Sequence, residues 1–132
     1  MDNYLEKLRA SFSLNISDLR FIAWDTETTG SAAGRDHIVE IAASSFDEEF
    51  ELRKFQTLIK PVVSIPQDIV AIHGISNDAV RSAPDIRTGL GLFFEFLELA
   101  GSPRIMVAHN APFDIQMVHG ECRRLKHAAA SS

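Results

Sequence analysis

The sequence has a single cysteine, no long apolar run and no excess of basic residues, and each scarcity excludes a class of protein. Cys122 cannot form an internal disulfide, and no second thiol lies near it for a metal site. No stretch approaches the roughly 18 apolar residues that a membrane helix needs. The first residues, MDNYLEKLRASF, carry acids where a signal peptide would be apolar. We therefore expect a cytoplasmic protein without membrane contact.

The charge balance limits how the chain can hold nucleic acid. Thirteen Lys and Arg residues against 18 Asp and Glu residues give a net charge of −5. A protein that tracks long nucleic acid neutralises phosphates along a basic face, so this charge has the wrong sign. Any contact with nucleic acid must be local and built around bound cations. With 132 residues and 45% hydrophobic composition, the chain is long enough for one domain with its own core.

Apolar runs and turn residues indicate the order of the elements. Strands are expected at 21–24, 38–43, 52–60 and 105–108, and helices at 68–72, from Pro84 to 99, and from Pro112 into Arg124. Three strands in a meander, followed by helices around a fourth strand, are typical of an α/β fold with a mixed sheet and packed helices.

The expected division of the chain has three parts. Leu5, Leu8 and Phe12 recur at helical spacing, so residues 1–20 are interpreted as an N-terminal helical appendage. Residues 21–127 form the α/β domain, and residues 128–132 are a tail. The short charge runs Asp47 to Glu49 and Arg123-Arg124 are interpreted as solvated surface.

Carboxylates follow two of the predicted strands. Asp25 and Glu27 are separated by one residue, so an extended backbone projects both from the same face. Two carboxylates held together repel each other unless a cation lies between them, and Mg²⁺ or Mn²⁺ suits such oxygen ligands. Taken alone, such a pair is ordinary exposed surface. Asp114 changes that weighting, because it follows another apolar strand, and neighbouring strands bring their ends to one edge of a sheet.

Three ordered segments resemble the DEDD superfamily of 3′-5′ exonucleases. FIAWDTETTG at residues 21–30 is similar to the first motif of the family, and VAHNAPFD at residues 107–114 is similar to the second. Between them, IHGI at residues 72–75 resembles the histidine-glycine signature of the group that contains the proofreading (epsilon) subunit of bacterial DNA polymerase III. The resemblance covers about residues 21–126.

The resemblance implies a ribonuclease-H-like fold whose carboxylates bind two Mg²⁺ or Mn²⁺ ions. Asp25 would bridge both ions, Glu27 would hold the ion that carries the nucleophile, and Asp114 would hold the other. The implied substrate is the 3′ end of single-stranded nucleic acid, DNA in preference to RNA, cleaved to nucleoside 5′-monophosphates. The implied partner is a DNA polymerase subunit, and the implied role is DNA proofreading or repair.

The resemblance also implies a set of residues that contact the substrate. These are Thr28, Thr29, Gly30, Ile72, His73, His109, Asn110 and Phe113. Simpler roles remain open for several of them. His73 suits the end of a helix, His109 and Asn110 suit a cap for the helix that follows, and Phe113 suits the core. Residues 28–30 suit a plain turn.

One part of the family pattern is missing. Its third motif, a His or Tyr followed by a fourth Asp, has no match, because Asp114 is the last Asp of the chain. His119 and His127 lie too close to Asp114 to serve. The general base, one metal ligand and the fifth strand are therefore absent, and we expect a C-terminally incomplete fold.

Two interpretations follow from that absence. The chain is either an exonuclease domain whose sequence has been cut short, or a short, catalytically silent module that binds nucleotides or a partner protein. Either way, we expect weak Mn²⁺ binding and little or no turnover by these 132 residues alone. We also expect the apolar run Ile105-Met106-Val107 to be left uncovered, because such runs suit strands that are buried on both faces.

Overall fold

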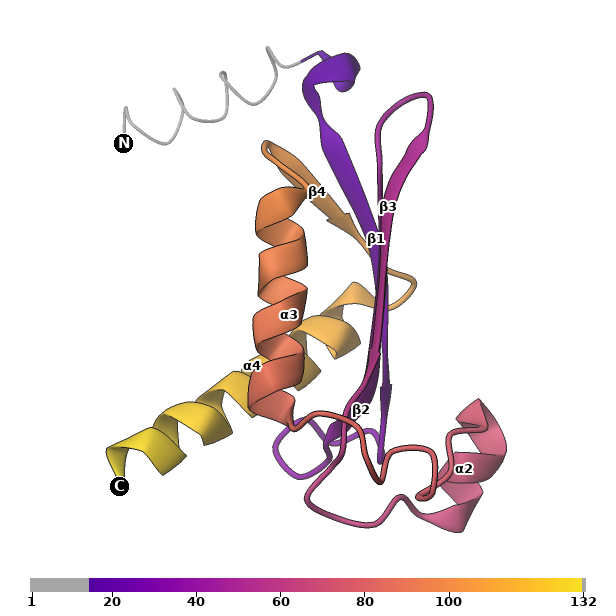
Figure 1. Cartoon of the computed structure of the whole chain (residues 1–132), viewed down its shortest axis with the longest axis vertical. Helices are drawn as coiled ribbons and strands as arrows, with labels where there is room; N and C mark the ends of the chain where they lie inside the picture. Colours follow the sequence, from indigo (N-terminus) through magenta and orange to yellow (C-terminus); the bar gives the residue numbers. More distant parts are fainter. Residues whose placement is uncertain (1–14, 132) are drawn as a thin grey trace.

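A four-stranded sheet in the order β3-β2-β1-β4 organises the structure. The computed structural model describes residues 15–131. After a 3-10 turn, η1 (Ile16–Asp18), the elements are β1 (Arg20–Thr28), β2 (Ile38–Phe46), β3 (Glu51–Leu58), α2 (Gln67–His73), α3 (Ile86–Leu99), β4 (Arg104–Val107) and α4 (Ala111–Ala130) (Figure 1).

The strand directions confirm the predicted mixed sheet. β1 pairs antiparallel with β2, and β2 pairs antiparallel with β3, which is the expected meander. β4 lies parallel to β1, with Arg20 opposite Arg104 and Ala23 opposite Val107. Parallel strands cannot be joined by a tight turn. The long connection from β3 to β4 includes α3, which crosses one face of the sheet (Figure 1).

β1 is longer than predicted. The apolar run was expected to end at Trp24, but the strand continues through Thr28. Trp24, Thr26 and Thr28 are buried on one face and alternate with the more exposed Asp25 and Glu27 on the other. This alternation is that of a strand with one solvated face. The two acids therefore lie within the strand, where ladder hydrogen bonds fix their backbone.

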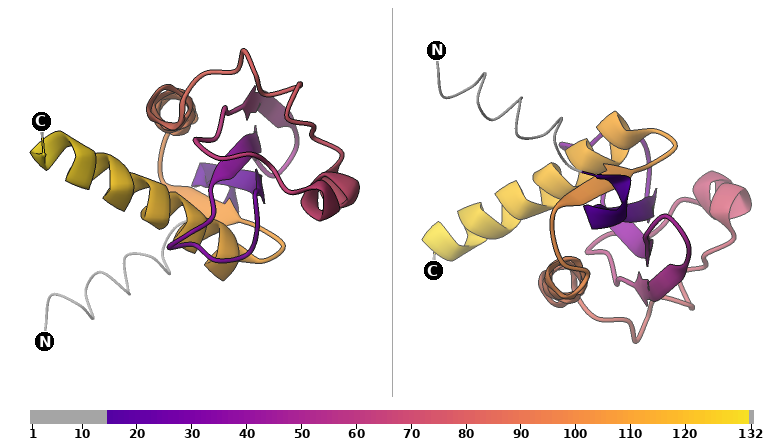
Figure 2. Two further views of the ribbon diagram at one scale, coloured as in Figure 1. Left: turned by 90° about the horizontal axis from the view of Figure 1, so that it is seen from below. Right: turned by 90° about the horizontal axis from the view of Figure 1, so that it is seen from above.

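Both long helices cover the same face of the sheet. α3 and α4 lie on one side and the short α2 lies on the other, as the views from below and above also show (Figures 1 and 2). Ile22 and Trp24 of β1 pack there against Phe93 of α3 and Met117 of α4. The rings of Trp24 and Phe93 stack with centroids 5.6 Å apart. This layer is the main core.

The opposite face is only partly covered. A small cluster of Val39, Ile65 and Val80 packs near α2. Beyond it the sheet is open, with a groove of about 770 Å³ that Asp25 and His109 help to line. The acids of β1 thus face a solvent-accessible side of the sheet.

β4 has the exposure that its sequence predicted. Ile105, Met106 and Val107 are 42%, 40% and 43% exposed, although all three are apolar. The strand lies at the end of the sheet order, so one side of its backbone ladder is unpaired among the described residues.

The observed elements at the two ends of the domain differ from the predicted ones. Residues 1–14 of the expected N-terminal helix lie outside the described residues, and Arg20 already belongs to β1. At the other end, α4 continues through Ala128–Ala130, which were predicted to be tail. Across residues 15–131, no helix is long and apolar enough to span a membrane.

α4 approaches the loop between β1 and β2 closely at Gly120. A Cβ on Gly120 would lie 2.3 Å from the carbonyl oxygen of Ala33, which is shorter than any real contact of this kind. The clash is with backbone, so a side-chain rotation cannot relieve it. Gly91 in α3 offers a matched position, since a Cβ there meets nothing within 4 Å.

We expect Gly120→Ala to lower the free energy of unfolding by about 1–3 kcal/mol, because the extra methyl group forces the helix and loop apart. Gly91→Ala should raise it by about 0.5–1 kcal/mol, because alanine favours the helix. Urea unfolding followed by Trp24 fluorescence measures both. A Gly120→Ala protein as stable as Gly91→Ala would show that the contact is not tight.

Candidate active site

Asp25 and Glu27 project side by side from the open face of β1. Asp25 lies opposite Ala42, a small residue that leaves room beside the carboxylate. Glu27 lies opposite Glu40 of β2, whose Oε2 accepts a 2.8 Å hydrogen bond from Gln56 Nε2. The predicted shared face is thus confirmed, and it holds a third acid, Glu40, that sequence reasoning had left without a role.

Partial burial and neighbouring acids disfavour the ionisation of Asp25 and Glu27. Partial removal from water raises the pKa of Asp25, and the negative charge of Asp114 raises it further. Desolvation likewise raises the pKa of Glu27, followed by the charge of Asp25. His109 opposes the shift at Asp25 and His73 opposes it at Glu27, but both pKa values stay raised. A cation between the acids would favour their charged forms.

Asp114 reaches the same strand from the helix side. Its side chain is 1% exposed, and Oδ1 accepts hydrogen bonds from Thr26 N at 3.0 Å and Thr26 Oγ1 at 2.7 Å. Its second oxygen, Oδ2, meets no donor in the described part of the chain, so it remains available as a ligand. Thr26 points away from Asp25 and Glu27, and its contact with Asp114 was not foreseen.

His73 is held by two hydrogen bonds at the end of α2. The N–H of Ile75 donates to Nδ1 at 3.0 Å, so in this arrangement the ring proton lies on Nε2, which is 3.1 Å from the carbonyl oxygen of Thr28. Gly74 makes the turn between them possible, since its φ of 78° suits glycine. The ring thus lies at the end of β1, where it influences Glu27. Ile72 is 78% exposed and unpacked.

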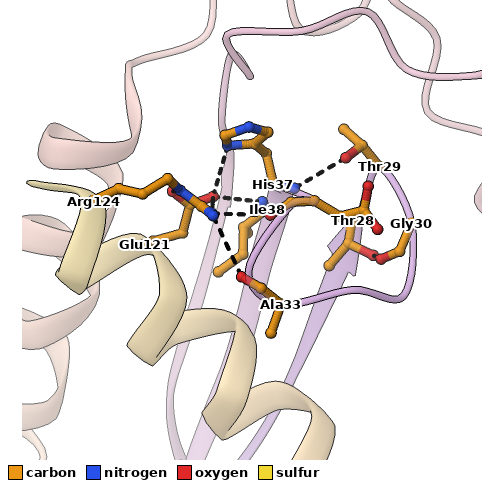
Figure 3. A network of polar contacts seen from close by, with 9 residues as sticks. Thr28, Thr29, Gly30, Ala33, His37, Ile38, Glu121 and Arg124 are labelled. Carbon is orange, nitrogen blue, oxygen red and sulfur yellow. Dashed lines mark hydrogen bonds and ion pairs between the residues drawn. The ribbon is translucent and has the colours of Figure 1, made fainter.

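The loop from residue 29 to residue 37, here called the β1–β2 loop, closes on itself by hydrogen bonds. Thr29 N donates to His37 O at 2.8 Å, and His37 N donates to Thr29 Oγ1 at 3.0 Å (Figure 3). Thr28 Oγ1 donates to Gly30 O at 2.7 Å. The Thr29 N–H is therefore occupied, whereas the Gly30 N–H meets no acceptor among residues 15–131. Of these two donors, Gly30 is the one left for a ligand.

His109 and Asn110 follow β4, and both are exposed. Asn110 occupies the N-cap position of α4, but its side chain makes no capping hydrogen bond, so the alternative role as a side-chain cap is wrong. Its carbonyl oxygen accepts from Phe113 N at 2.9 Å. Phe113 itself packs against the main core, as its simpler interpretation predicted.

The carboxylates of Asp25, Glu27 and Asp114 suit a Mg²⁺ site in which water and substrate phosphate complete the coordination. Within residues 15–131, no group of three or more His, Cys, Asp or Glu side chains is arranged to hold a metal ion. Mg²⁺, however, is usually bound by one or two carboxylates and completed by water and substrate phosphate. Asp25 and Glu27 fit that pattern, with the free oxygen of Asp114 on the other side of the strand. The three-carboxylate site stays a prediction.

The chain is similar in sequence to a family of known proteins. A family model described as Exonuclease, RNase_T, matches residues 22–131. DNA polymerase III subunit epsilon of Treponema pallidum is 38% identical over 101 residues, which cover 76% of this chain and 45% of that protein. The epsilon subunit of Rickettsia felis is 38% identical over 115 residues, which cover 86% and 48%. The chain thus spans about half the length of these relatives.

Solved structures share the fold. Exonuclease X in complex with 5′ overhanging duplex DNA is 30% identical with a TM-score of 0.59, covering 76% of this chain and 53% of that one. Product-bound exonuclease I has a TM-score of 0.70 at 20% identity, covering 81% and 26%. At that identity the second likeness concerns the fold alone.

We expect Asp25→Asn and Glu27→Gln to stabilise the metal-free protein at pH 7. A carboxyl whose pKa is raised by folding supports stability below its unfolded pKa and loses that support as pH rises through its folded pKa. The urea midpoints of the variants should therefore exceed that of the wild type at pH 7, and the difference should fade towards pH 3. Variants that unfold more easily than the wild type at pH 7 would contradict the raised pKa values of these two carboxyl groups.

We expect Thr26→Val to lower the free energy of unfolding by about 1.5–3 kcal/mol, because a hydrogen bond to a charged, buried carboxylate is lost. Thr26→Ser keeps the hydroxyl and should recover most of this loss. Thermal or urea unfolding of the two variants separates the contribution of the hydroxyl to the free energy of unfolding from that of the methyl group. If both variants lose the same stability, packing rather than the bond to Asp114 is responsible.

Proposed function

This chain belongs to the RNase_T family of exonucleases, hydrolases of phosphodiester bonds, and from that membership we propose that it acts at the 3′ end of single-stranded nucleic acid. One observation carries the proposal. Asp25 and Glu27 lie side by side on an open strand with raised pKa values, and Asp114 acts on the same strand from behind. These are the residues that match the family's first two motifs.

Asp25, Glu27 and Asp114 would hold the two divalent cations, Mg²⁺ or Mn²⁺. Such ions, when bound between carboxylates, supply an activated water and stabilise the charge that develops on the phosphate oxygens. The protein side of this arrangement is the fixed backbone of β1, which keeps both acids on one face, and Thr26, which keeps Asp114 against the strand.

The terminal nucleotide would lie between the end of β1 and the α2 region. The Gly30 N–H meets no acceptor among residues 15–131, and His73 is held against the end of β1. His109 lines the groove beside Asp25. Thr28, Thr29, Ile72, Asn110 and Phe113 complete the proposed substrate residues, with Thr29 shaping the loop through His37 and Phe113 bracing the start of α4.

The biological setting proposed is DNA proofreading or repair in the cytoplasm, with a DNA polymerase subunit as partner. Its support is the likeness to proteins named DNA polymerase III subunit epsilon and to an exonuclease solved with DNA. DNA is proposed over RNA on the same ground. No side chain in these 132 residues matches the family's general base, so binding should exceed turnover.

The test measures binding and cleavage together. With Mn²⁺, linear single-stranded DNA with a free 3′-hydroxyl should bind more tightly than a circular strand of the same composition, and more tightly than matched RNA. Any shortening of 5′-labelled DNA should start at the 3′ end, release nucleoside 5′-monophosphates and be slow. Asp25→Asn should abolish both effects, whereas Glu95→Gln on the exposed side of α3 should change neither.

Three outcomes would count against the proposal. Equal binding of linear and circular strands would remove the 3′-end specificity. Cleavage that survives Asp25→Asn would remove the carboxylate site. An absence of Mn²⁺ and DNA binding, in a protein that remains folded, would favour the alternative of a catalytically silent module that binds a partner protein.

A further inference from the structure

The β1–β2 loop has little apolar packing beyond that of Ala33, which is partly buried against the main core. None of the five residues from Ser31 to Arg35 is buried. Their side chains are small except for that of Arg35, which is exposed. A loop of this kind keeps its conformational freedom unless hydrogen bonds restrain it. Some restraint is internal, because Asp36 Oδ2 accepts from Ala32 N at 2.8 Å. Thr29 and His37 add two further internal hydrogen bonds. Additional restraint comes from α4.

α4 contacts the backbone of this loop and of the strand that follows it. Arg124 donates from Nη2 to Asp36 O at 2.9 Å and from Nη1 to Ala33 O at 3.4 Å. Glu121 Oε1 accepts from Ile38 N at 3.0 Å. Figure 3 shows Glu121 and Arg124 directed together at this stretch of backbone. Sequence reasoning had placed Arg124 on a solvated surface, and that interpretation is wrong.

The two side chains also fix each other. Glu121 is 2% exposed, and its carboxylate pairs with Arg124 through Nη2–Oε1 at 3.0 Å and Nε–Oε2 at 3.2 Å. His37 Nδ1 lies 3.3 Å from Oε1. A two-point pair of this geometry holds the guanidinium in one orientation, unlike a single-point pair on an open surface. Arg124 is therefore a fixed donor to the loop.

The restraint extends to the proposed nucleotide contact. His37, at the anchored end of the loop, makes two hydrogen bonds with Thr29. Asp36 packs against Gly30 so closely that a Cβ on Gly30 would lie 2.5 Å from Oδ2. We propose that Glu121 and Arg124 are positioning residues that hold the β1–β2 loop so that the Gly30 N–H meets the terminal nucleotide. This inference rests on the proposed function.

The metal ligands have a separate anchor. Asp114 lies about two helical turns before Glu121 on the same side of α4, and Thr26 holds it independently of the loop. Loosening the loop at Arg124 leaves Asp25, Glu27 and Thr26 in place. Nucleotide affinity should then fall while cation affinity stays unchanged, which a general loss of structure would not produce.

Arg124→Lys is the decisive variant, because it keeps a positive charge beside Glu121 but cannot reach both Ala33 O and Asp36 O. We expect it to weaken the binding of thymidine 5′-monophosphate in Mn²⁺ by about 5-fold or more. The apparent affinity for Mn²⁺ alone should stay within about 2-fold of the wild type. Amide hydrogen exchange should become faster in residues 29–37. Arg123→Lys, on the exposed neighbouring position, should change none of these.

A second variant, Glu121→Gln, keeps the inference testable if Arg124→Lys does not fold. Glu121→Gln keeps an acceptor for Ile38 N but presents an amide donor to Arg124, so it should accelerate exchange in the same loop and weaken nucleotide binding in the same direction. Unchanged amide exchange of the loop in both variants would overturn the inference. So would faster exchange with unaltered nucleotide affinity, or a loss of Mn²⁺ affinity as large as the loss of nucleotide affinity. Failure of the wild type to bind the nucleotide would overturn the proposed function instead, while the exchange data would still test the restraint.

Discussion

The hydrogen bonds from Thr26 to Asp114 join two parts of the chain that are 88 positions apart. A carboxylate that is 1% exposed would be costly to bury without partners, and here one oxygen has two donors from the middle of β1. The bonds place the first turn of α4 against the strand that carries Asp25 and Glu27. Everything proposed for the site depends on that placement, because Asp114 comes from a different element.

Glu121 repeats the arrangement further along the same helix. Asp114 accepts a backbone N–H from β1, and Glu121 accepts one from the first residue of β2. Between them, Met117 and Val118 pack into the main core. Apolar contacts are non-directional and tolerate small sliding of a helix over a sheet, whereas hydrogen bonds to strand N–H groups do not. The two carboxylates therefore fix the register of α4, and the apolar residues supply much of the burial.

Most of the fold follows from apolar runs and turn residues, but contacts between distant elements do not. The runs at Ile38 and Ile105 mark strands correctly, and Gly74 marks the end of α2. The end of β1 was misplaced because acids after Trp24 look like a turn, when they form the solvated half of an alternating strand. Thr26 and Glu121 were missed because each gains its role from a partner more than 80 positions away. A carboxylate two turns after Asp114 on a helix was the available signal for Glu121.

The distribution of acids bears on how a chain of net charge −5 would bind the polyanion proposed as its substrate. Asp25, Glu27 and Glu40 share the open face of the sheet. Partial burial raises the pKa of Asp25 and of Glu27, and neighbouring carboxylates raise them further, chiefly Asp114 at Asp25 and Asp25 at Glu27. Removing the repulsion between these carboxylates needs a positive charge, and the described surroundings supply only the partial compensation of His73 and His109. A divalent cation supplies it fully and also attracts phosphate. The charge that disfavours binding to long nucleic acid is thus compatible with the proposed activity, because removal of a terminal nucleotide would need recognition of only one phosphate beside the cation.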